Sequence, residues 1–380
     1  MLPDGTKADY ALCDRHGRAM AVIEAKRSST DPRTAERQAV HYARQLQVPF
    51  AFLSNGSEVW FWEYEREAHP HAVRTFFAQE DLERRIATLA TRVDPLSIPI
   101  DTKIAGRGYQ KECIEALCQA IAQGRRKLLV EMATGTGKTR TAAALIKRLF
   151  QANAVTRVLF LVDRITLAKQ TEDVFAEQLR DYPAYVLRPG RRFQDEKRIT
   201  ITTLQSMVSV YRSYSAGYFD LVITDECHRS IYGKWSGVLK HFDGVQLGLT
   251  ATPCVVSQAV LDKLPDKEDA AFVKDTLRFF EVDRSTGRSR SRRPPRAVSR
   301  SAATSSTGPP WTIRPRPSSS SCLPIARPSR SIRMRSSGAS RSPSATGRWS
   351  RSSGRSWTRA ILDRMASGAR PWKARRSSSP

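Results

Sequence analysis

The stretch LLVEMATGTGKTRTAAALIKRL (residues 128–149) decides the fold. An apolar run precedes a glycine-rich turn, and a helical pattern of apolar residues follows it. Strand, turn and helix in this order predict a phosphate-binding loop, because the N–H groups of the turn and of the helix N-terminus attract phosphate oxygens. Met132 takes the place of the first glycine of the general pattern. The residues predicted to bind ATP are Thr134, Gly135, Thr136, Gly137, Lys138 and Thr139, with Lys138 on the β/γ-phosphates and Thr139 on Mg²⁺.

A second apolar run, FDLVITDECH (219–228), ends in two carboxylates. Ligands bind at the carboxyl ends of parallel strands, so we expect this pair to face the phosphate loop. Asp225 is predicted to hold Mg²⁺ through water, and Glu226 to polarise the water that attacks the γ-phosphate. Such a pair alone is more often a solvated turn. Its place after a phosphate loop, with His228 completing a DExH arrangement, indicates ATP hydrolysis.

Residues 101–283 alternate short apolar runs with helical patterns, which predicts a doubly wound, parallel α/β sheet. The ATGTGKT and DECH segments resemble those of superfamily 2 helicases, so this part is expected to be a first RecA-like motor domain. The resemblance implies that Gln110 in RGYQKECIEAL reads adenine. It also implies that LFLVDRITLAKQT and ITTLQSM touch the DNA backbone, and that Thr250 and Thr252 in LGLTATP couple hydrolysis to movement.

Residues 1–100 mix strands and helices and contain a candidate hydrolytic site. DYALCDRHGRAMAVIEAK (9–26) predicts two strands joined at DRHGR, with Glu24 and Lys26 on one face because they are two residues apart. Asp9 is expected to converge on them. Two carboxylates that bind Mg²⁺ and a lysine that stabilises developing charge form a metal-dependent hydrolytic constellation. The motif resembles that of PD-(D/E)xK nucleases, although a Glu and a Lys on one strand face are more often a solvated pair.

The following helix, in STDPRTAERQAVHYARQL, is predicted to be capped by Thr30 or Asp31 and places Gln38 and Tyr42 on one face. This QxxxY pair resembles the nuclease of type I restriction subunits, where it would position DNA or the metal site. Nuclease first and motor second, over residues 1–283, resembles the restriction subunit of type I restriction–modification enzymes. The resemblance implies translocation on double-stranded DNA driven by ATP, metal-dependent cleavage, and partnership with modification (methyltransferase) and specificity subunits.

Residues 284–380 have a different composition from the rest of the chain. They contain 22 Arg, one Lys and one acidic residue, so most of the formal net charge of +26 lies there and residues 1–283 carry only +4. We expect a disordered tail translated out of frame; a genuine Arg/Ser-rich nucleic-acid-binding segment is the alternative. The chain is also expected to be incomplete at its N-terminus. Without a second motor domain it should bind nucleotide poorly and should not translocate.

Two further classes of function remain open from the sequence. One is another superfamily 2 DNA helicase with a nuclease-like appendage, and the other is a non-enzymatic nucleic-acid-binding protein. The six cysteines have no CxxC spacing, which favours reduced thiols and a cytoplasmic protein over a zinc site or a disulfide framework. No apolar run approaches the roughly 20 residues that span a bilayer, so no membrane association is expected.

Overall fold

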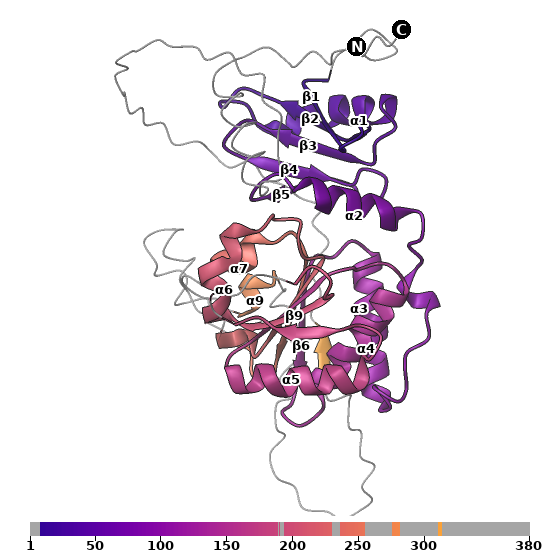
Figure 1. Cartoon of the computed structure of the whole chain (residues 1–380), viewed down its shortest axis with the longest axis vertical. Coiled ribbons are helices and arrows are strands. Elements are labelled where there is room, and N and C mark those ends of the chain that lie inside the picture. Colours follow the sequence, from indigo (N-terminus) through magenta and orange to yellow (C-terminus); the bar gives the residue numbers. More distant parts are fainter. Residues whose placement is uncertain are drawn as a thin grey trace, which may run out of the picture.

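The computed structural model describes residues 8–188, 190, 194–229, 236–254, 276–281 and 311–313. Figure 1 shows two sheets, each with its own helices, and the strand β5 and the helix α2 lie where the two parts meet. Of the residues in these ranges, none belongs to a helix that is both long enough and apolar enough to cross a membrane.

The amino-terminal sheet has five strands in the order β1-β2-β3-β4-β5. Only β2 and β3 are parallel, because the helix α1 connects them; the other neighbours are antiparallel. The predicted strand pair around DRHGR is confirmed, and Gly17 adopts a left-handed φ of 81° in its turn. The elements are β1 (Tyr10–Cys13), β2 (Ala19–Ala25), η1 (Pro32–Ala35), α1 (Glu36–Gln45), β3 (Phe50–Ser54), β4 (Val59–Trp62), β5 (His71–Val73), α2 (Gln79–Leu89) and η2 (Pro95–Ser97).

Both faces of this sheet are covered by apolar side chains. Ala39 and Ala43 of α1 pack with Val22 and Leu53 on one face. The other face carries a cluster of aromatic rings with Leu82 of α2, whose rings are Phe50, Phe52, Phe61, Phe76 and Phe77. Asp31, one of the two predicted capping residues, caps the short helix η1 that leads into α1: its carboxylate accepts from the N–H of Arg33 at 2.9 Å, whereas α1 itself has no side-chain cap.

The second sheet has the order β12-β6-β11-β10-β7-β9-β8, and all its neighbours are parallel except β12 and β6. Its parallel strands coincide with the apolar runs of residues 101–283, so a mixed α/β unit with a parallel sheet is confirmed. The elements are α3 (Gly108–Ala122), β6 (Lys127–Met132), α4 (Lys138–Gln151), β7 (Val158–Val162), α5 (Ile165–Gln178), β8 (Ala184–Val186), β9 (Ile199–Thr203), α6 (Leu204–Val210), η3 (Tyr211–Ser213), β10 (Leu221–Asp225), η4 (Cys227–Arg229), α7 (Ser236–His241), β11 (Val245–Thr250), α9 (Thr276–Phe279) and β12 (Trp311–Ile313).

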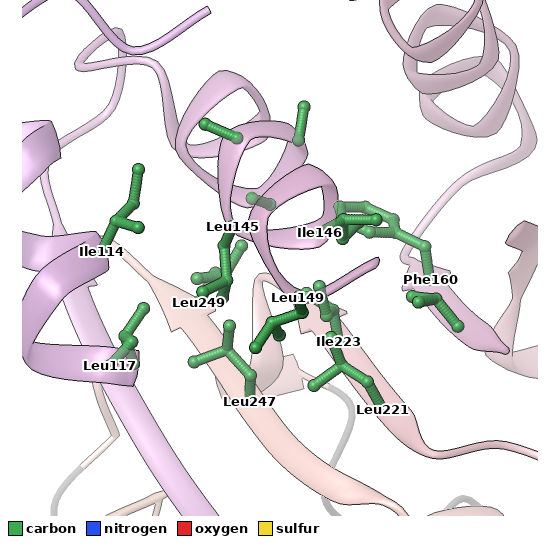
Figure 2. Packing of buried hydrophobic residues seen from close by; sticks show 14 of the residues in the cluster. Ile114, Leu117, Leu145, Ile146, Leu149, Phe160, Leu221, Ile223, Leu247 and Leu249 are labelled. Carbon is green, nitrogen blue, oxygen red and sulfur yellow. The ribbon is translucent and has the colours of Figure 1, made fainter. Parts of the chain in front are cut away.

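Helices pack on both faces of the second sheet. Figure 2 shows one face, where Leu145 and Leu149 of α4 meet Leu247 and Leu249 of β11 and Ile223 of β10. Burying a leucine or isoleucine contributes about 1.5–3 kcal/mol, so this layer holds the phosphate loop rigidly against the strands. The opposite face packs against α6, α7 and the short helix α9.

The strand β12 differs from the expectation for residues 284–380. It pairs antiparallel with β6, which is otherwise at the edge of the sheet, so Trp311–Ile313 has regular structure where none was predicted. An unpaired strand edge presents free N–H and C=O groups to any extended segment, and a Thr–Ile pair favours extended backbone. The rest of the predicted disordered tail, residues 284–310 and 314–380, lies outside the described residues.

Candidate functional site

The phosphate loop follows β6, and α4 begins directly at Lys138. Gly135 and Gly137 have left-handed φ values of 79° and 88°, a backbone that a side chain would strain. A Cβ on Gly137 would also lie 2.8 Å from Nε2 of Gln110. Thr136 closes the turn, since its hydroxyl donates to the carbonyl of Ala133 at 2.6 Å. The loop therefore has the shape that aims N–H groups at an anion; Thr134 is exposed and Thr139 is half-buried.

The acidic pair lies across the same sheet edge. Nζ of Lys138 is 3.0 Å from Oε1 of Glu226, and the Lys138 side chain is only 9% exposed. Asp225, the last residue of β10, accepts from the N–H of Glu226 at 3.0 Å. Burial raises the pKa of Asp225, and the charge of Glu226 acts in the same direction. The structure thus brings Lys138 and the DE pair together, although Lys138 contacts Glu226 and not Asp225.

Glu226 itself has a left-handed φ of 48°, which is uncommon for a residue with a side chain. This backbone directs the carboxylate toward both Lys138 and His228, whose Nδ1 is 3.5 Å from Oε2 of Glu226. Strain of this kind is held at functional sites by the surrounding contacts.

The segment containing Thr250 and Thr252 is joined to the acidic pair through His228. Nδ1 of His228 is 2.9 Å from the hydroxyl of Thr250, and that hydroxyl also accepts from the N–H of Thr252 at 3.2 Å. The sequence interpretation did not predict this contact. It could have been found from topology, because β10 and β11 are parallel neighbours and end side by side.

Gln110, predicted to read adenine, is 4% exposed. Its Nε2 donates to the carbonyl of Thr136 at 3.3 Å and its Oε1 accepts from the N–H of Arg107 at 3.3 Å. Tyr109, which the sequence interpretation missed, donates to the same Thr136 carbonyl at 2.9 Å. Both residues therefore hold the phosphate loop, and adenine recognition by Gln110 stays a prediction.

The five residues proposed for the amino-terminal site form one connected group. Asp9 accepts from the N–H of Ala25 at 2.9 Å, so the carboxylate lies beside the end of β2. Nζ of Lys26 is 2.7 Å from Oε1 of Glu24 and donates to Oε1 of Gln38 at 3.0 Å. The remaining contact runs from Nε2 of Gln38 to the hydroxyl of Tyr42, at 3.0 Å.

The donor set of this group fits a divalent cation that keeps water ligands. Glu24 is 2% exposed, and its Oε2 is buried without a hydrogen-bond partner. Burial raises the pKa of Glu24; Lys26 opposes the increase and Asp9 adds to it. A buried carboxylate oxygen that has no hydrogen-bond partner and lies near a second carboxylate is suited to binding Mg²⁺, which proteins often hold with one or two carboxylates. Within the described ranges, no group of three or more His, Cys, Asp or Glu side chains is arranged to hold a metal ion, so water or substrate would complete the coordination.

One more residue near this group escaped the sequence interpretation. Asn55 donates from Nδ2 to the carbonyl of Thr30 at 3.1 Å, and its Oδ1 accepts from the N–H groups of Ser57 and Glu58. The carbonyl of the preceding Ser54 accepts from the N–H of Lys26 at 2.7 Å. The Asn–Gly pair in SNGSE is a turn signal that could have pointed to Asn55.

Comparison with known proteins matches two segments of the chain to restriction enzymes. Residues 4–74 match the family model described as "Type I restriction enzyme R protein N terminus", and residues 103–255 match "Type III restriction enzyme, res subunit". A fragment structure assigned to an HsdR subunit of a type I restriction enzyme from Vibrio vulnificus YJ016 is 27% identical and covers 72% of this chain and 48% of that one. Its TM-score of 0.34 is low, so the sequence matches carry the assignment.

Two relatives from Escherichia coli agree with the family models. The type I restriction enzyme EcoAI endonuclease subunit is 31% identical over 277 residues, which are 65% of this chain and 33% of that protein. The EcoKI endonuclease subunit of strain K12 is 26% identical over 254 residues, 56% of this chain and 22% of that protein. The chain thus spans about a third or less of these relatives. Over residues 4–74 and 103–255, the chain is therefore similar to the endonuclease subunits of type I restriction enzymes and to the res subunit of type III enzymes.

Proposed function

We propose that this chain supplies the nuclease and the first ATPase lobe of a type I restriction subunit that moves double-stranded DNA with ATP and cuts it. The contact between Lys138 and Glu226 at the carboxyl edge of a parallel sheet carries the proposal. In this proposal residues 1–100 form a PD-(D/E)xK nuclease-like domain and residues 101–283 form a RecA-like lobe. The family models that match residues 4–74 and 103–255 support both assignments.

The resting contact between Lys138 and Glu226 defines the first step at the ATP site. The β- and γ-phosphates take the place of the Glu226 carboxylate on Lys138, because a triphosphate offers more negative charge to the same ammonium. The released carboxylate can then orient water and accept its proton as the water attacks the γ-phosphorus and the bond to the β-phosphate oxygen breaks. Thr139 and Asp225 are the residues that would hold Mg²⁺, which neutralises phosphate charge when bound.

At the amino-terminal site, Asp9 and Glu24 would hold a second Mg²⁺. Lys26 is kept in place by Gln38, and Gln38 is kept in place by Tyr42. The ammonium of Lys26, 2.7 Å from Oε1 of Glu24, would stabilise the negative charge that develops as water adds to a DNA phosphorus and a P–O bond breaks. The role of Gln38 and Tyr42 in this proposal is to orient Lys26.

Ligand binding tests the two sites separately in the purified chain. Fluorescent ATP titrated into the wild type and into Lys138→Ala should show a loss of affinity of at least about tenfold in the variant. Titration calorimetry with Mn²⁺ as the metal probe should show a binding event that Glu24→Gln removes and Lys138→Ala leaves intact. Unchanged ATP affinity in Lys138→Ala, or Mn²⁺ binding that survives in Glu24→Gln, would refute the corresponding half of the proposal.

The partners are proposed from the same family. A type I subunit works with modification and specificity subunits, so the chain should copurify with a methyltransferase encoded beside it. A helicase acting in DNA repair with a nuclease-like appendage would copurify with no such subunit, and that outcome would favour the rival function.

A further inference from the structure

Two carboxylates, with side chains 15% (Asp220) and 5% (Asp243) exposed, lie at the edge of the second sheet opposite to the ATP site. Asp220 immediately precedes β10 and Asp243 comes just before β11, whereas Glu226 and Thr250 stand at or just beyond the other ends of these strands. Each carboxylate forms an ion pair with one of two consecutive arginines of α2. Nη1 of Arg84 is 2.5 Å from Oδ2 of Asp220, and Nη2 of Arg85 is 3.3 Å from Oδ2 of Asp243.

These arginines are buried to an extent that is unusual for surface ion pairs. The side chains of Arg84 and Arg85 are 15% and 13% exposed. Arg84 also donates to the carbonyl of Gly217 at 2.7 Å, and Arg85 lies over the ring of Phe77 with 4.5 Å between its guanidinium carbon and the ring centroid. Removing one partner of a buried ion pair leaves an uncompensated charge, which costs far more than breaking an exposed pair.

A second group of charges surrounds Asp243. Nε2 of His71 in β5 is 2.7 Å from Oδ1 of Asp243, and the other ring nitrogen is 3.3 Å from Glu67. Arg126, which precedes β6, contacts both Glu67 and Asp243. Residues from the amino-terminal part and from the second sheet thus share one charge network, and Asp243 is at its centre.

The apolar packing crosses the same boundary. Ala216 belongs to the aromatic core of the amino-terminal sheet, where it is fully buried. A Cβ built on its neighbour Gly217 would lie 2.7 Å from Cγ of Phe77, so the backbone of the second part approaches this ring as closely as glycine allows. A hydrogen bond adds to the contact, because the N–H of Ala78 donates to the side-chain hydroxyl of Ser215 at 2.9 Å.

The connecting segment, which lies between α2 and α3, also makes contacts with the second part. The N–H of Val93 donates to the carbonyl of Ala152 at 3.0 Å, and the carbonyl of Leu96 accepts from Nη2 of Arg148 at 3.0 Å. Lys147 of α4 then pairs with Asp101 at 2.7 Å. A flexible tether would not make three successive contacts with the same helix and its end.

We propose that residues 8–89 are docked on the amino-terminal edge of the second sheet as a fixed part of the ATPase lobe, with Arg84 and Arg85 as the docking residues. The partner of this intramolecular surface is the pair Asp220 and Asp243 together with residues 215–217. The amino-terminal site and the ATP site then move as one body, so the position of any cut relative to the DNA track is set by this interface and not by a linker. The docking holds whether or not either site proves to be catalytic.

Limited trypsin digestion of the full chain, read by mass spectrometry, tests the docking at Arg92, whose side chain is 17% exposed and lies 3.4 Å from Glu63 of the amino-terminal part. In the wild type this site should be cut no faster than sites in core strands. The double variant Arg84→Ala/Arg85→Ala should be cut there at least about tenfold faster, while Arg37→Ala, an exposed arginine of α1, should match the wild type. Cleavage of the connecting segment in the wild type that leaves two folded fragments would overturn the proposal.

A second variant keeps the test decisive if the arginine variants fail to fold. Gly217→Ala adds one methyl group that clashes only when Phe77 is docked, and Gly108→Ala, where a Cβ meets nothing within 4 Å, is the matched control. Gly217→Ala should speed cleavage of the connecting segment, whereas Gly108→Ala should not. Equal cleavage rates in these two variants would show that the parts are not docked.

Discussion

The resting contact between Lys138 and Glu226 predicts that Glu226→Gln tightens nucleotide binding. At 3.0 Å and an effective dielectric constant of about 20, the Coulomb attraction between the two charges is about 5.5 kcal/mol. Hydration regained by both groups on separation offsets most of this, which leaves about 1–2 kcal/mol for a pair exposed by 9% and 28%. Since ATP must break the contact to reach Lys138, the variant should bind about 5- to 30-fold more tightly.

The assay is equilibrium titration of a fluorescent ATP analogue, followed by anisotropy. Glu177→Gln, an exposed glutamate of α5, is the matched control and should leave the dissociation constant unchanged. The gain should also vanish when Lys138→Ala is added to Glu226→Gln, because the effect passes through that ammonium. Unchanged or weaker binding in Glu226→Gln alone would refute the competition between carboxylate and phosphate.

Four other changes have expected outcomes. Burial raises the pKa of Asp220, but Arg84 outweighs it and lowers this pKa to about 2, so the carboxylate contributes about 2–3 kcal/mol above pH 4 that is lost as pH falls to 2. Asp220→Asn should therefore lower urea stability at pH 7 and raise the pH of acid unfolding. Burial lowers the pKa of His71, but Asp243 outweighs it, so the pKa is raised overall. The stability that the imidazolium contributes should therefore be lost as pH rises above 6.5. Thermal unfolding should show this loss, and His71→Gln should remove the pH dependence. Gly248→Ala should destabilise the fold by about 1–3 kcal/mol because its methyl group meets Phe280 and Cys227, again in urea. Asn55→Ala should reduce Mn²⁺ affinity by calorimetry without changing ATP affinity, since it frees the turn that holds the backbone of Lys26.

The sequence predicted that Lys138 and the acidic pair face each other, because parallel strands end at one sheet edge. The structure places Nζ of Lys138 3.0 Å from Oε1 of Glu226, although β11 lies between β6 and β10. The grouping of the five amino-terminal residues could also be predicted from the sequence. Strand alternation puts Glu24 and Lys26 on one face, and the i, i+4 spacing puts Gln38 and Tyr42 on one face of the helix.

Other features could not be predicted because they depend on long-range packing. Arg84 and Asp220 are 136 residues apart, and no local pattern marks two ordinary charges as partners. Gln110 was predicted as a ligand-binding residue, but only the tertiary structure shows that both ends of its amide already bind the protein. The strand β12 was missed because its pairing depends on the open edge of β6 and not on its own sequence.

The insertion of Ala216 among the phenylalanines of the other sheet has a practical consequence. A polypeptide that starts at residue 101 would carry Ala216 and Gly217 on an exposed hydrophobic surface, beside Asp220 without Arg84 and Asp243 without Arg85. Expressed alone, this polypeptide should precipitate or bind chaperones. Fragments that are divided at the predicted domain boundary between residues 100 and 101 should therefore not be soluble.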